Sequence, residues 1–291
     1  MNKFLFSISI TFITILTTSI VIARDYKETE NIINQILKQN KQAETMQPKQ
    51  DNQEEAEEAQ PAQRQRKDNR GNRNSPTAAD ELSLYRIGIQ FYESALFDNA
   101  LKHFNDLLDK YPQSQYADSA KIWKGKTLMK KRAFRDAISS FSSVAENSGE
   151  YPAALYNMGL CFVFLKQPND AVARFQRVVI QAPDNSLADK ALLESAKVFL
   201  QQKNGNKAVE SLVKIIKQYP NRESVAEAYY YLAKVLEQDP AMRDIESARN
   251  LLRQFLKKAE QGERFFKDSP LRERVVADLN YIERNYFKYE N

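Results

Sequence analysis

The sequence predicts an all-α protein, a solenoid of about five consecutive helical hairpins closed by one further helix. Three observations carry this prediction. Glycine is scarce, with 7 in 291 residues, which disfavours β-rich and glycine-loop architectures. Charged residues make up 28% of the chain, and Ala, Leu, Lys, Gln and Glu, which favour helix, are abundant. From Glu81 onward, small and large apolar residues recur at intervals of 37, 34 and 37 residues.

Residues 1–23, "MNKFLFSISITFITILTTSIVIA", have the layout of an export signal. Lys3 precedes an apolar stretch, and Val21 and Ala23 satisfy the small-residue rule for cleavage. We expect cleavage after Ala23. The alternative is an uncleaved membrane anchor over residues 4–22, because the stretch approaches the roughly 20 residues that span a bilayer. In both cases the rest of the chain is expected to be exported, in the periplasm or attached to the envelope.

Residues 24–46 are expected to form a short amphipathic helix. Ile32, Ile33, Ile36 and Leu37 fall on one helical face. This face could pair with copies of itself through residues 25–40, but a coiled coil needs at least three heptads. Oligomerisation through this helix is therefore expected to be weak, and the helix alone is expected to fray.

Residues 47–80 are expected to be a disordered linker, because their only apolar side chains besides proline are alanines. The charges are separated into an acidic stretch, "DNQEEAEEAQ", and a basic stretch, "RQRKDNRGNR". No aromatic residue lies among the basic ones to stack on bases, so no nucleic-acid partner is expected. The basic stretch is expected at most to touch anionic lipid or a cell-wall polymer weakly, and a plain spacer is the alternative.

The repeated segment, residues 81–260, is aligned by windows that start at Glu81, Asp118, Pro152 and Asp189. Position 8 of each window is small and position 24 is large and apolar. The pairs are Gly88 with Phe104, Gly125 with Phe141, Gly159 with Phe175, and Ala196 with Leu212. Small residues at position 8 and alanine at position 20 let two antiparallel helices approach closely. The large side chains fill the space between neighbouring hairpins.

Proline marks the joints between hairpins at position 32. It is Pro112, Pro183 and Pro220, whereas the second window has Gly149. Proline cannot continue a helix and restricts the residue before it.

The serines after these joints, Ser114, Ser186 and Ser224, are candidate N-caps. A looser fifth unit follows the four windows. Residues 261–291 are expected to form a capping helix, with Ser269 as N-cap, Pro270 at its first position, and Leu271, Val275, Val276, Leu279 and Ile282 as its apolar stripe.

Composition argues against catalysis. The chain has one cysteine, Cys161, and one histidine, His103. No intramolecular disulfide and no Cys/His zinc site can form, and no paired acid–base arrangement or phosphate-binding loop is present. We therefore expect no enzyme activity, no metal and no cofactor; an accessory subunit of an envelope enzyme is the weaker alternative.

The pattern of small, large and proline positions resembles the tetratricopeptide repeat. The resemblance implies a right-handed solenoid whose first helices line a concave groove. It also implies that residues at fixed positions of these helices contact a partner. The residues so assigned are Tyr85, Tyr92, Ile122, Lys126, Lys130, Tyr156, Lys197, Tyr230 and Lys234. Their tyrosines and lysines suit an extended or helical segment of acidic character. The alternative is that the apolar ones pack between hairpins.

The joint "YPQSQYADSA" is similar to joints in envelope proteins of diderm bacteria. The order of signal, short helix, linker and repeats is similar to that of the periplasmic cell-division coordinator of the Tol–Pal system. Outer-membrane lipoproteins that assemble β-barrels are also similar, but the cysteine that would carry a lipid is absent here. This resemblance implies a non-enzymatic, exported scaffold that binds another envelope protein. The alternative is an inner-membrane-anchored assembly or cell-division factor with its repeats in the periplasm.

Overall fold

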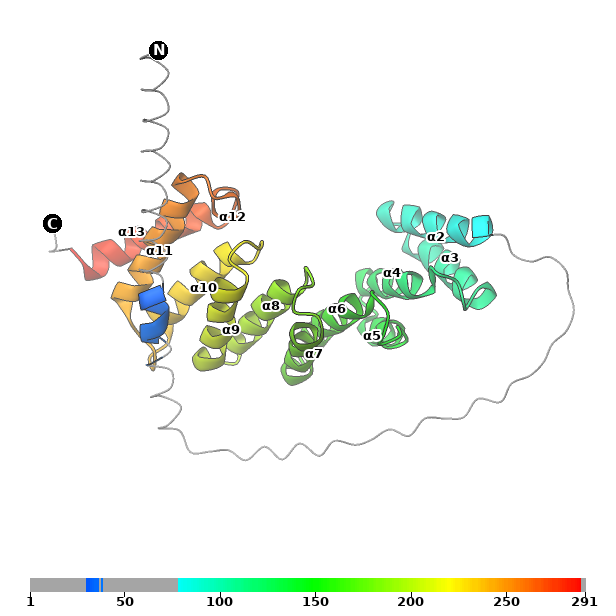
Figure 1. The fold of residues 1–291 in the computed structure, drawn as a ribbon, viewed down its shortest axis with the longest axis horizontal. Helices are drawn as coiled ribbons and strands as arrows, with labels where there is room; N and C mark the ends of the chain where they lie inside the picture. The colour runs from blue at the N-terminus through cyan, green and yellow to red at the C-terminus, as the bar shows by residue number, and fades with distance from the viewer. Residues whose placement is uncertain (1–29, 37, 39–77, 289–291) are drawn as a thin grey trace, which may run out of the picture. The chain divides into compact units, whose positions relative to one another are not determined.

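The computed structural model describes residues 30–36, 38 and 78–288. Within these residues every regular element is helical, and ten helices form five consecutive hairpins (Figure 1). The hairpins are α2 (Ala78–Glu93) with α3 (Phe97–Lys110), α4 (Ala117–Lys130) with α5 (Phe134–Ser142), α6 (Tyr151–Phe164) with α7 (Pro168–Gln181), α8 (Ala188–Gln201) with α9 (Gly205–Gln218), and α10 (Val225–Gln238) with α11 (Ile245–Glu260). Helices α12 (Arg264–Lys267) and α13 (Arg272–Tyr286) follow. The predicted fold class is confirmed.

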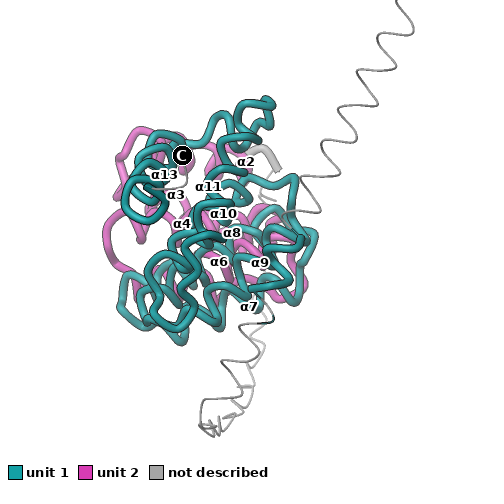
Figure 2. The backbone as a smooth tube through the Cα atoms, turned by 90° about the vertical axis from the view of Figure 1, so that its left-hand side faces the viewer, with its two compact units in different colours: residues 1–45, 158–291 teal, residues 46–157 magenta. Residues whose placement is uncertain are grey.

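The chain divides into two compact units within α6 (Figure 2). One unit ends at Asn157 and contains α2 to α5. The other contains α7 to α13 from Met158 onward, together with the helical residues 30–36 and 38. The expected export signal over 1–23 and residues 47–77 of the expected linker lie outside the described residues. The last three residues of the expected linker, 78–80, belong to α2 instead. No helix among the described residues is long and apolar enough to cross a membrane.

Helix pairing within a hairpin depends on the small residue of position 8. A Cβ atom placed on Gly88 would lie 2.6 Å from Cε1 of Phe104, and one on Gly125 would lie 2.4 Å from Cε1 of Phe141. Both phenylalanine rings are fully buried. The third hairpin repeats this contact, because a Cβ atom on Gly159 would lie 2.4 Å from Cε1 of Phe175. The predicted close approach of the two helices is thus confirmed.

The predicted helix ends at proline are also confirmed. Helices α3, α7 and α9 each end two residues before the proline of position 32, and each is 14 residues long. The second hairpin lacks this proline. Its second helix, α5, has only 9 residues and ends at Ser142.

Side-chain caps differ from the prediction. The N-caps of α4 and α8 are Tyr116 and Leu187, and neither these nor Ser224 at α10 caps through its side chain. Ser114 instead accepts a hydrogen bond from the amide of Tyr116, two residues on, at 3.1 Å. This bond closes a single turn ahead of the helix. In the third joint Asn185, not Ser186, does the same to Leu187 at 2.9 Å.

The C-terminal helix needs a similar correction. Its N-cap is Leu271, so Pro270 lies before the helix and not at its first position. Ser269 accepts a hydrogen bond from the amide of Leu271 in the turn before the helix. Of the predicted apolar stripe, Val275, Leu279 and Ile282 are buried, whereas Val276 is 41% exposed. The buried residues face α11, which contacts α13.

The first helices of four hairpins end in a left-handed residue that is not glycine. Ala95, Arg132, Lys166 and Lys203 have φ between 58° and 60°. In each case the next amide bonds back to the carbonyl five residues earlier, as from Leu96 to Phe91 at 2.8 Å. This is the hydrogen-bond pattern of the Schellman motif. It turns the chain sharply into the second helix.

Candidate functional site

Aromatic side chains gather on the first helices of the unit that contains α2 to α5. Tyr85 of α2 stacks on Tyr116 with ring centroids 5.2 Å apart. Its hydroxyl accepts a hydrogen bond from Nε1 of Trp123 on α4 at 3.1 Å. Tyr92 meets Trp123 edge-on at 5.2 Å. All four rings are half-buried and rest on the core below them. They form a rigid surface that combines apolar area with hydroxyl groups.

Lys126 adds a positive charge to this aromatic surface. Its Nζ lies 4.5 Å from the centroid of the Trp123 ring, within range of a cation–π interaction. Burial lowers the pKa of Lys126, and the nearby Glu150 carboxylate opposes this shift only in part. Lys130, one turn further along α4, is exposed. The end of α4 is thus the cationic part of this surface.

The second unit has a pocket of about 800 Å³ on its first helices. Tyr230, Tyr231 and Lys234 of α10 form one wall, Leu200 of α8 forms another, and Arg274 of α13 lies opposite. The ring of Tyr230 is 5.8 Å from the Arg274 guanidinium, and its hydroxyl donates to Asp278 at 3.2 Å. The pocket therefore combines apolar, aromatic and cationic surface.

The lysines of this second unit are already engaged by carboxylates. Lys197 pairs with Glu194 and Glu227, each at 3.1 Å. Lys234 pairs with Glu237 at 2.5 Å and with Asp278 at 3.3 Å. Burial alone would lower the pKa of each lysine, but the paired carboxylates outweigh it and raise the pKa above its usual value. These two cations are largely neutralised within the fold.

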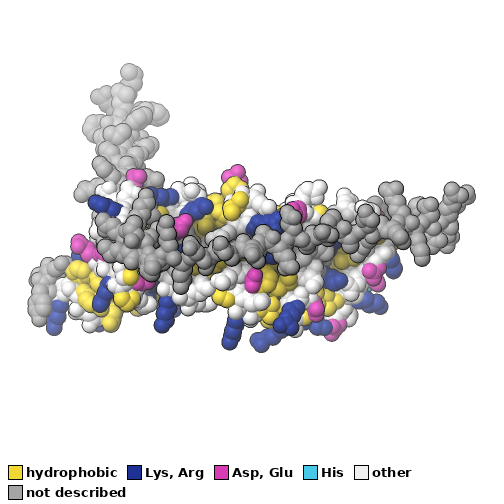
Figure 3. Space-filling model, turned by 90° about the horizontal axis from the view of Figure 1, so that it is seen from below, with side chains coloured by type: hydrophobic (Ala, Val, Ile, Leu, Met, Phe, Trp, Pro, Cys, Tyr) yellow, Lys and Arg dark blue, Asp and Glu magenta, His cyan; other side chains and the backbone are white. Residues whose placement is uncertain are grey.

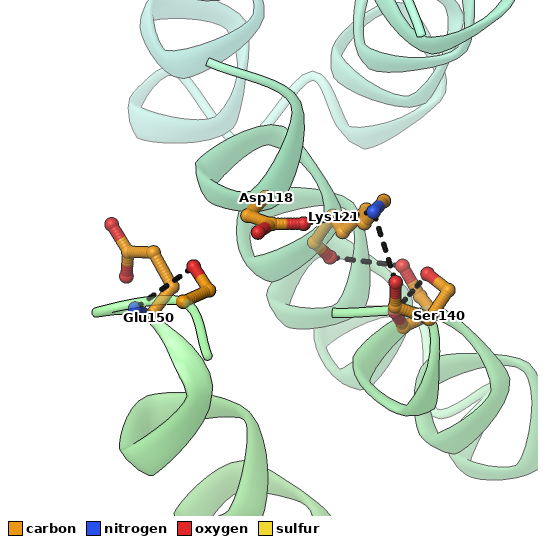
Figure 4. A network of polar contacts seen from close by, with 6 residues as sticks. Asp118, Lys121, Ser140 and Glu150 are labelled. Atoms are coloured by element: carbon orange, nitrogen blue, oxygen red, sulfur yellow. Dashed lines mark hydrogen bonds and ion pairs between the residues drawn. The ribbon is translucent and has the colours of Figure 1, made fainter. Parts of the chain in front are cut away.

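A polar network fastens the second hairpin (Figure 4). Lys121 pairs with Asp118 at 2.8 Å and donates to the carbonyl of Ser143 at 2.9 Å. Ser140 on α5 donates back to the carbonyl of Lys121 at 2.9 Å. Partial burial raises the pKa of Asp118, but hydrogen bonds from Lys121 and Ser148 outweigh it, so this pKa lies below its usual value. The network stabilises structure and offers no reactive group.

The predicted partner residues fall into two groups by burial. Ile122 and Tyr230 are each only 3% exposed, so most of their surface is taken up inside the fold. The others are half-buried or exposed: Tyr85, Tyr92, Lys126, Lys130, Tyr156, Lys197 and Lys234. Tyr85, Tyr92 and Lys126 are brought together around Trp123, whereas Tyr230 and Lys234 line the pocket. That these residues bind a partner stays a prediction.

Sequence reasoning missed several residues of these surfaces. Tyr116 lies in a joint between two hairpins, where the repeat pattern assigns no partner residue. Leu271 and Arg274 belong to the C-terminal segment, which lies beyond the repeats. Tyr231 lies between positions that the repeat pattern assigns to the groove. The run of three tyrosines from Tyr229 to Tyr231 was the one signal that could have drawn attention to it.

The described residues contain no reactive cluster. Among them, no group of three or more His, Cys, Asp and Glu side chains could hold a metal ion. Burial raises the pKa of the Cys161 thiol to about 12, which keeps it protonated and unreactive at neutral pH. The His103 ring stacks on Phe91 at 5.2 Å, as expected of a structural side chain.

Three segments of the chain match the family model of the tetratricopeptide repeat. They are residues 82–114, 153–185 and 190–222, which correspond to the first, third and fourth hairpins. The chain contains tetratricopeptide repeats. The second hairpin, with its shortened α5, is not matched. Tetratricopeptide repeats stack helix pairs into extended surfaces suited to binding other proteins.

Solved structures share this fold. The crystal structure of MamA protein has 21% sequence identity and a TM-score of 0.52, covering 63% of this chain and 96% of MamA. The MamA RS-1 ArsTM double mutant has 14% identity and a TM-score of 0.50, covering 64% of this chain and 97% of its own. At these identities the similarity concerns the fold alone. No curated protein sequence matches this chain.

Proposed function

We propose that this protein is an exported, non-enzymatic scaffold that binds another cell-envelope protein through the first helices of its tetratricopeptide repeats. The observation that carries the proposal is the pocket on α8, α10 and α13. It offers Tyr231, Leu200 and Arg274 to a partner in one place, whereas Tyr230 is almost fully buried in its lining. Tyrosine and arginine are enriched among the residues that dominate the binding energy of protein interfaces.

The aromatic surface around Trp123 supports the same role in the other unit. Tyr85, Tyr92 and Trp123 hold one another in place, so little conformational freedom is lost when a partner covers them. Acidic character of the partner is supported here by Lys126 and Lys130. It is not supported around Lys197 and Lys234, whose charges are met within the fold. We therefore expect acidic residues of the partner to lie opposite the end of α4.

Export is proposed from the N-terminal sequence, with Lys3, the apolar stretch and Ala23 as its support. N-terminal sequencing of the mature protein tests it. A mature chain that begins at Arg24 supports cleavage. A chain that begins at Met1 and fractionates with membranes supports the alternative, an anchored assembly or cell-division factor. A chain that begins at Met1 in the cytoplasm contradicts both.

Site-specific photocrosslinking in intact cells tests the binding surface. A photoreactive residue at Tyr231 or Lys130 on the first helices is expected to give a defined adduct with an envelope protein. The matched control is Ile180 on α7, a second helix, where the side chain is 78% exposed. In a companion experiment the photoreactive residue stands at Leu200, in the same pocket. The variant Tyr231→Ala/Arg274→Ala is expected to reduce the yield of this adduct at least tenfold. Adducts of equal yield from Ile180, or none from either first-helix position, would count against the proposal.

A further inference from the structure

A second apolar surface lies outside the first-helix pocket, and the chain's own N-terminal helix occupies it. Residues 30–36 and 38 are helical, and Ile32, Ile33 and Ile36 are 7%, 1% and 0% exposed. Lys217 at the end of α9 donates a hydrogen bond to Oδ1 of Asn34 at 3.2 Å. These isoleucines are therefore covered by other residues of the same unit.

This surface, named here the joint groove, is built where the fourth and fifth hairpins meet the C-terminal helices. It is lined by Ile216, Lys217, Pro220, Val225, Tyr229, Lys258, Glu263 and Phe266. Its base is rigid, because Phe266 packs edge-on against both Tyr229 and Phe255 at 5.3 Å. Every lining residue except the occupant's own Glu30 and Ile33 comes from residues 216–266. The part of the groove beside Ile33 is therefore formed by the rest of the same unit.

The occupant is poorly suited to be a permanent part of the fold. A helix of two to three turns does not persist alone in water, so its structure depends on the groove. A pocket of about 60 Å³ lies beside Ile33. The segment is joined to α2 through residues 39–77, a connection of 39 residues. Because the segment and the groove belong to one chain, the segment rebinds in an intramolecular step. A long connection lowers the effective concentration of the segment at the groove.

We propose that the joint groove is a docking site for a short amphipathic helix, and that residues 30–36 and 38 of the same chain are its resident, reversibly bound occupant. The groove selects branched apolar residues with the spacing of Ile32, Ile33 and Ile36, beside a polar residue that reaches Lys217. This goes beyond the proposed function, because it assigns a second binding surface to the molecule. While the segment is docked, its isoleucines cannot also pair with those of another copy.

Peptide binding to the full chain tests the proposal. The variant Ile33→Asp/Ile36→Asp empties the joint groove by placing charges where 0 to 1% exposed side chains now lie. A fluorescent peptide of residues 27–40 is expected to bind this variant at least tenfold more tightly than the wild-type chain, whose groove is filled. Fluorescence anisotropy measures both affinities. The same peptide with the two aspartates is expected not to bind.

The matched control is Ile180→Asp, which makes the same chemical change at a 78% exposed position outside the groove. It is expected to bind the peptide as weakly as the wild-type chain does. Equal affinity for all three chains, or no binding to Ile33→Asp/Ile36→Asp when its circular dichroism shows folded repeats, overturns the proposal. A dimer that forms with rising concentration in the wild type and is lost in the emptied variant overturns the assignment to the same chain. None of these outcomes affects the photocrosslinking test of the proposed function, which uses positions on the first helices.

Discussion

At the scale of single residues, the hairpin turns carry backbone strain that the sequence does not reveal. Ala95, Arg132, Lys166 and Lys203 all adopt the left-handed region, which non-glycine residues rarely occupy. They recur at position 15 of the four windows, and neither alanine nor the three basic residues favour this conformation. The backbone hydrogen bond that closes each turn requires this conformation, so the turn geometry does not depend on the side chain at this position.

Lys166→Gly is expected to stabilise the protein. Glycine relieves a left-handed conformation that costs other residues roughly 1–2 kcal/mol, and it loses about 0.5–1 kcal/mol through its greater freedom in the unfolded chain. A net gain of about 0.5–1 kcal/mol should raise the denaturant midpoint followed by circular dichroism. Gly262 provides the reverse control, because its φ is 83° and a Cβ there would meet nothing within 4 Å. Gly262→Ala should destabilise by a similar amount; stabilisation by both variants would contradict the argument.

Asp118 gives the free energy of unfolding a dependence on acid. Its pKa in the folded protein lies below the usual 3.8, because hydrogen bonds and the Lys121 charge favour the carboxylate. A group with a depressed folded pKa stabilises the fold above its unfolded pKa, and this contribution is lost as pH falls through the folded pKa. The unfolding free energy of Asp118→Asn should therefore fall less steeply below pH 3.8 than that of the wild type. Equal slopes in acid denaturant titrations would refute this.

At the scale of elements, one contact sets the geometry of the first three hairpins. The glycine of the first helix receives the phenylalanine ring of the second, and this pair recurs in three hairpins. The sequence contains both partners at a fixed spacing, so the contact could be predicted. It also explains why Leu212 accompanies the only alanine at position 8, since a shorter side chain makes room for a methyl group.

Gly125→Ala is expected to destabilise the second hairpin. The new Cβ would lie 2.4 Å from a buried ring carbon of Phe141, and overpacking of this kind costs about 1–3 kcal/mol. The better helix propensity of alanine offsets this by up to about 1 kcal/mol. The double variant Gly125→Ala/Phe141→Leu copies the pair of the fourth hairpin and should recover part of the loss. A double-mutant cycle by urea denaturation measures the coupling, and strictly additive effects would disprove the contact model.

Other parts of the candidate site were beyond sequence reasoning. The pocket needs Arg274, which lies in α13, and the charge of Lys234 is met by Asp278 of the same helix. Both contacts depend on how the C-terminal helix packs, and no repeat pattern encodes that packing. Ile122 shows the converse, because its position in the repeat suggested a groove residue although it is almost fully buried. A shared position fixes the helix face only approximately, and local packing decides exposure.

At the scale of the whole molecule, the described residues mix positive and negative side chains. The chain carries a net charge of +5, but lysine and arginine side chains lie among acidic ones over the visible face of the described residues (Figure 3). Ion pairs such as Arg253 with Glu283 at 2.6 Å account for part of this mixing. Attraction to a partner should therefore depend on local features such as the end of α4.

The hairpins are not expected to be equally stable. Helix α5 buries Ala137, Ser140 and Phe141, whereas α9 of the fourth hairpin buries eight residues. The amides of α5 should exchange with deuterium about tenfold faster than those of α9, because fewer apolar contacts oppose local opening. Mass spectrometry of peptic fragments measures this difference. Slower exchange in α5 would show that its polar network compensates for the missing contacts.

The short α5 has a consequence for how the protein melts. Members of a linear stack contact only their neighbours, so a weak member does not have to open together with all the others. Heating should then unravel residues 78–150 first and leave residues 158–288 intact over some interval of temperature. A calorimetric scan would show two overlapping peaks, and brief trypsin treatment within that interval would leave a resistant C-terminal fragment.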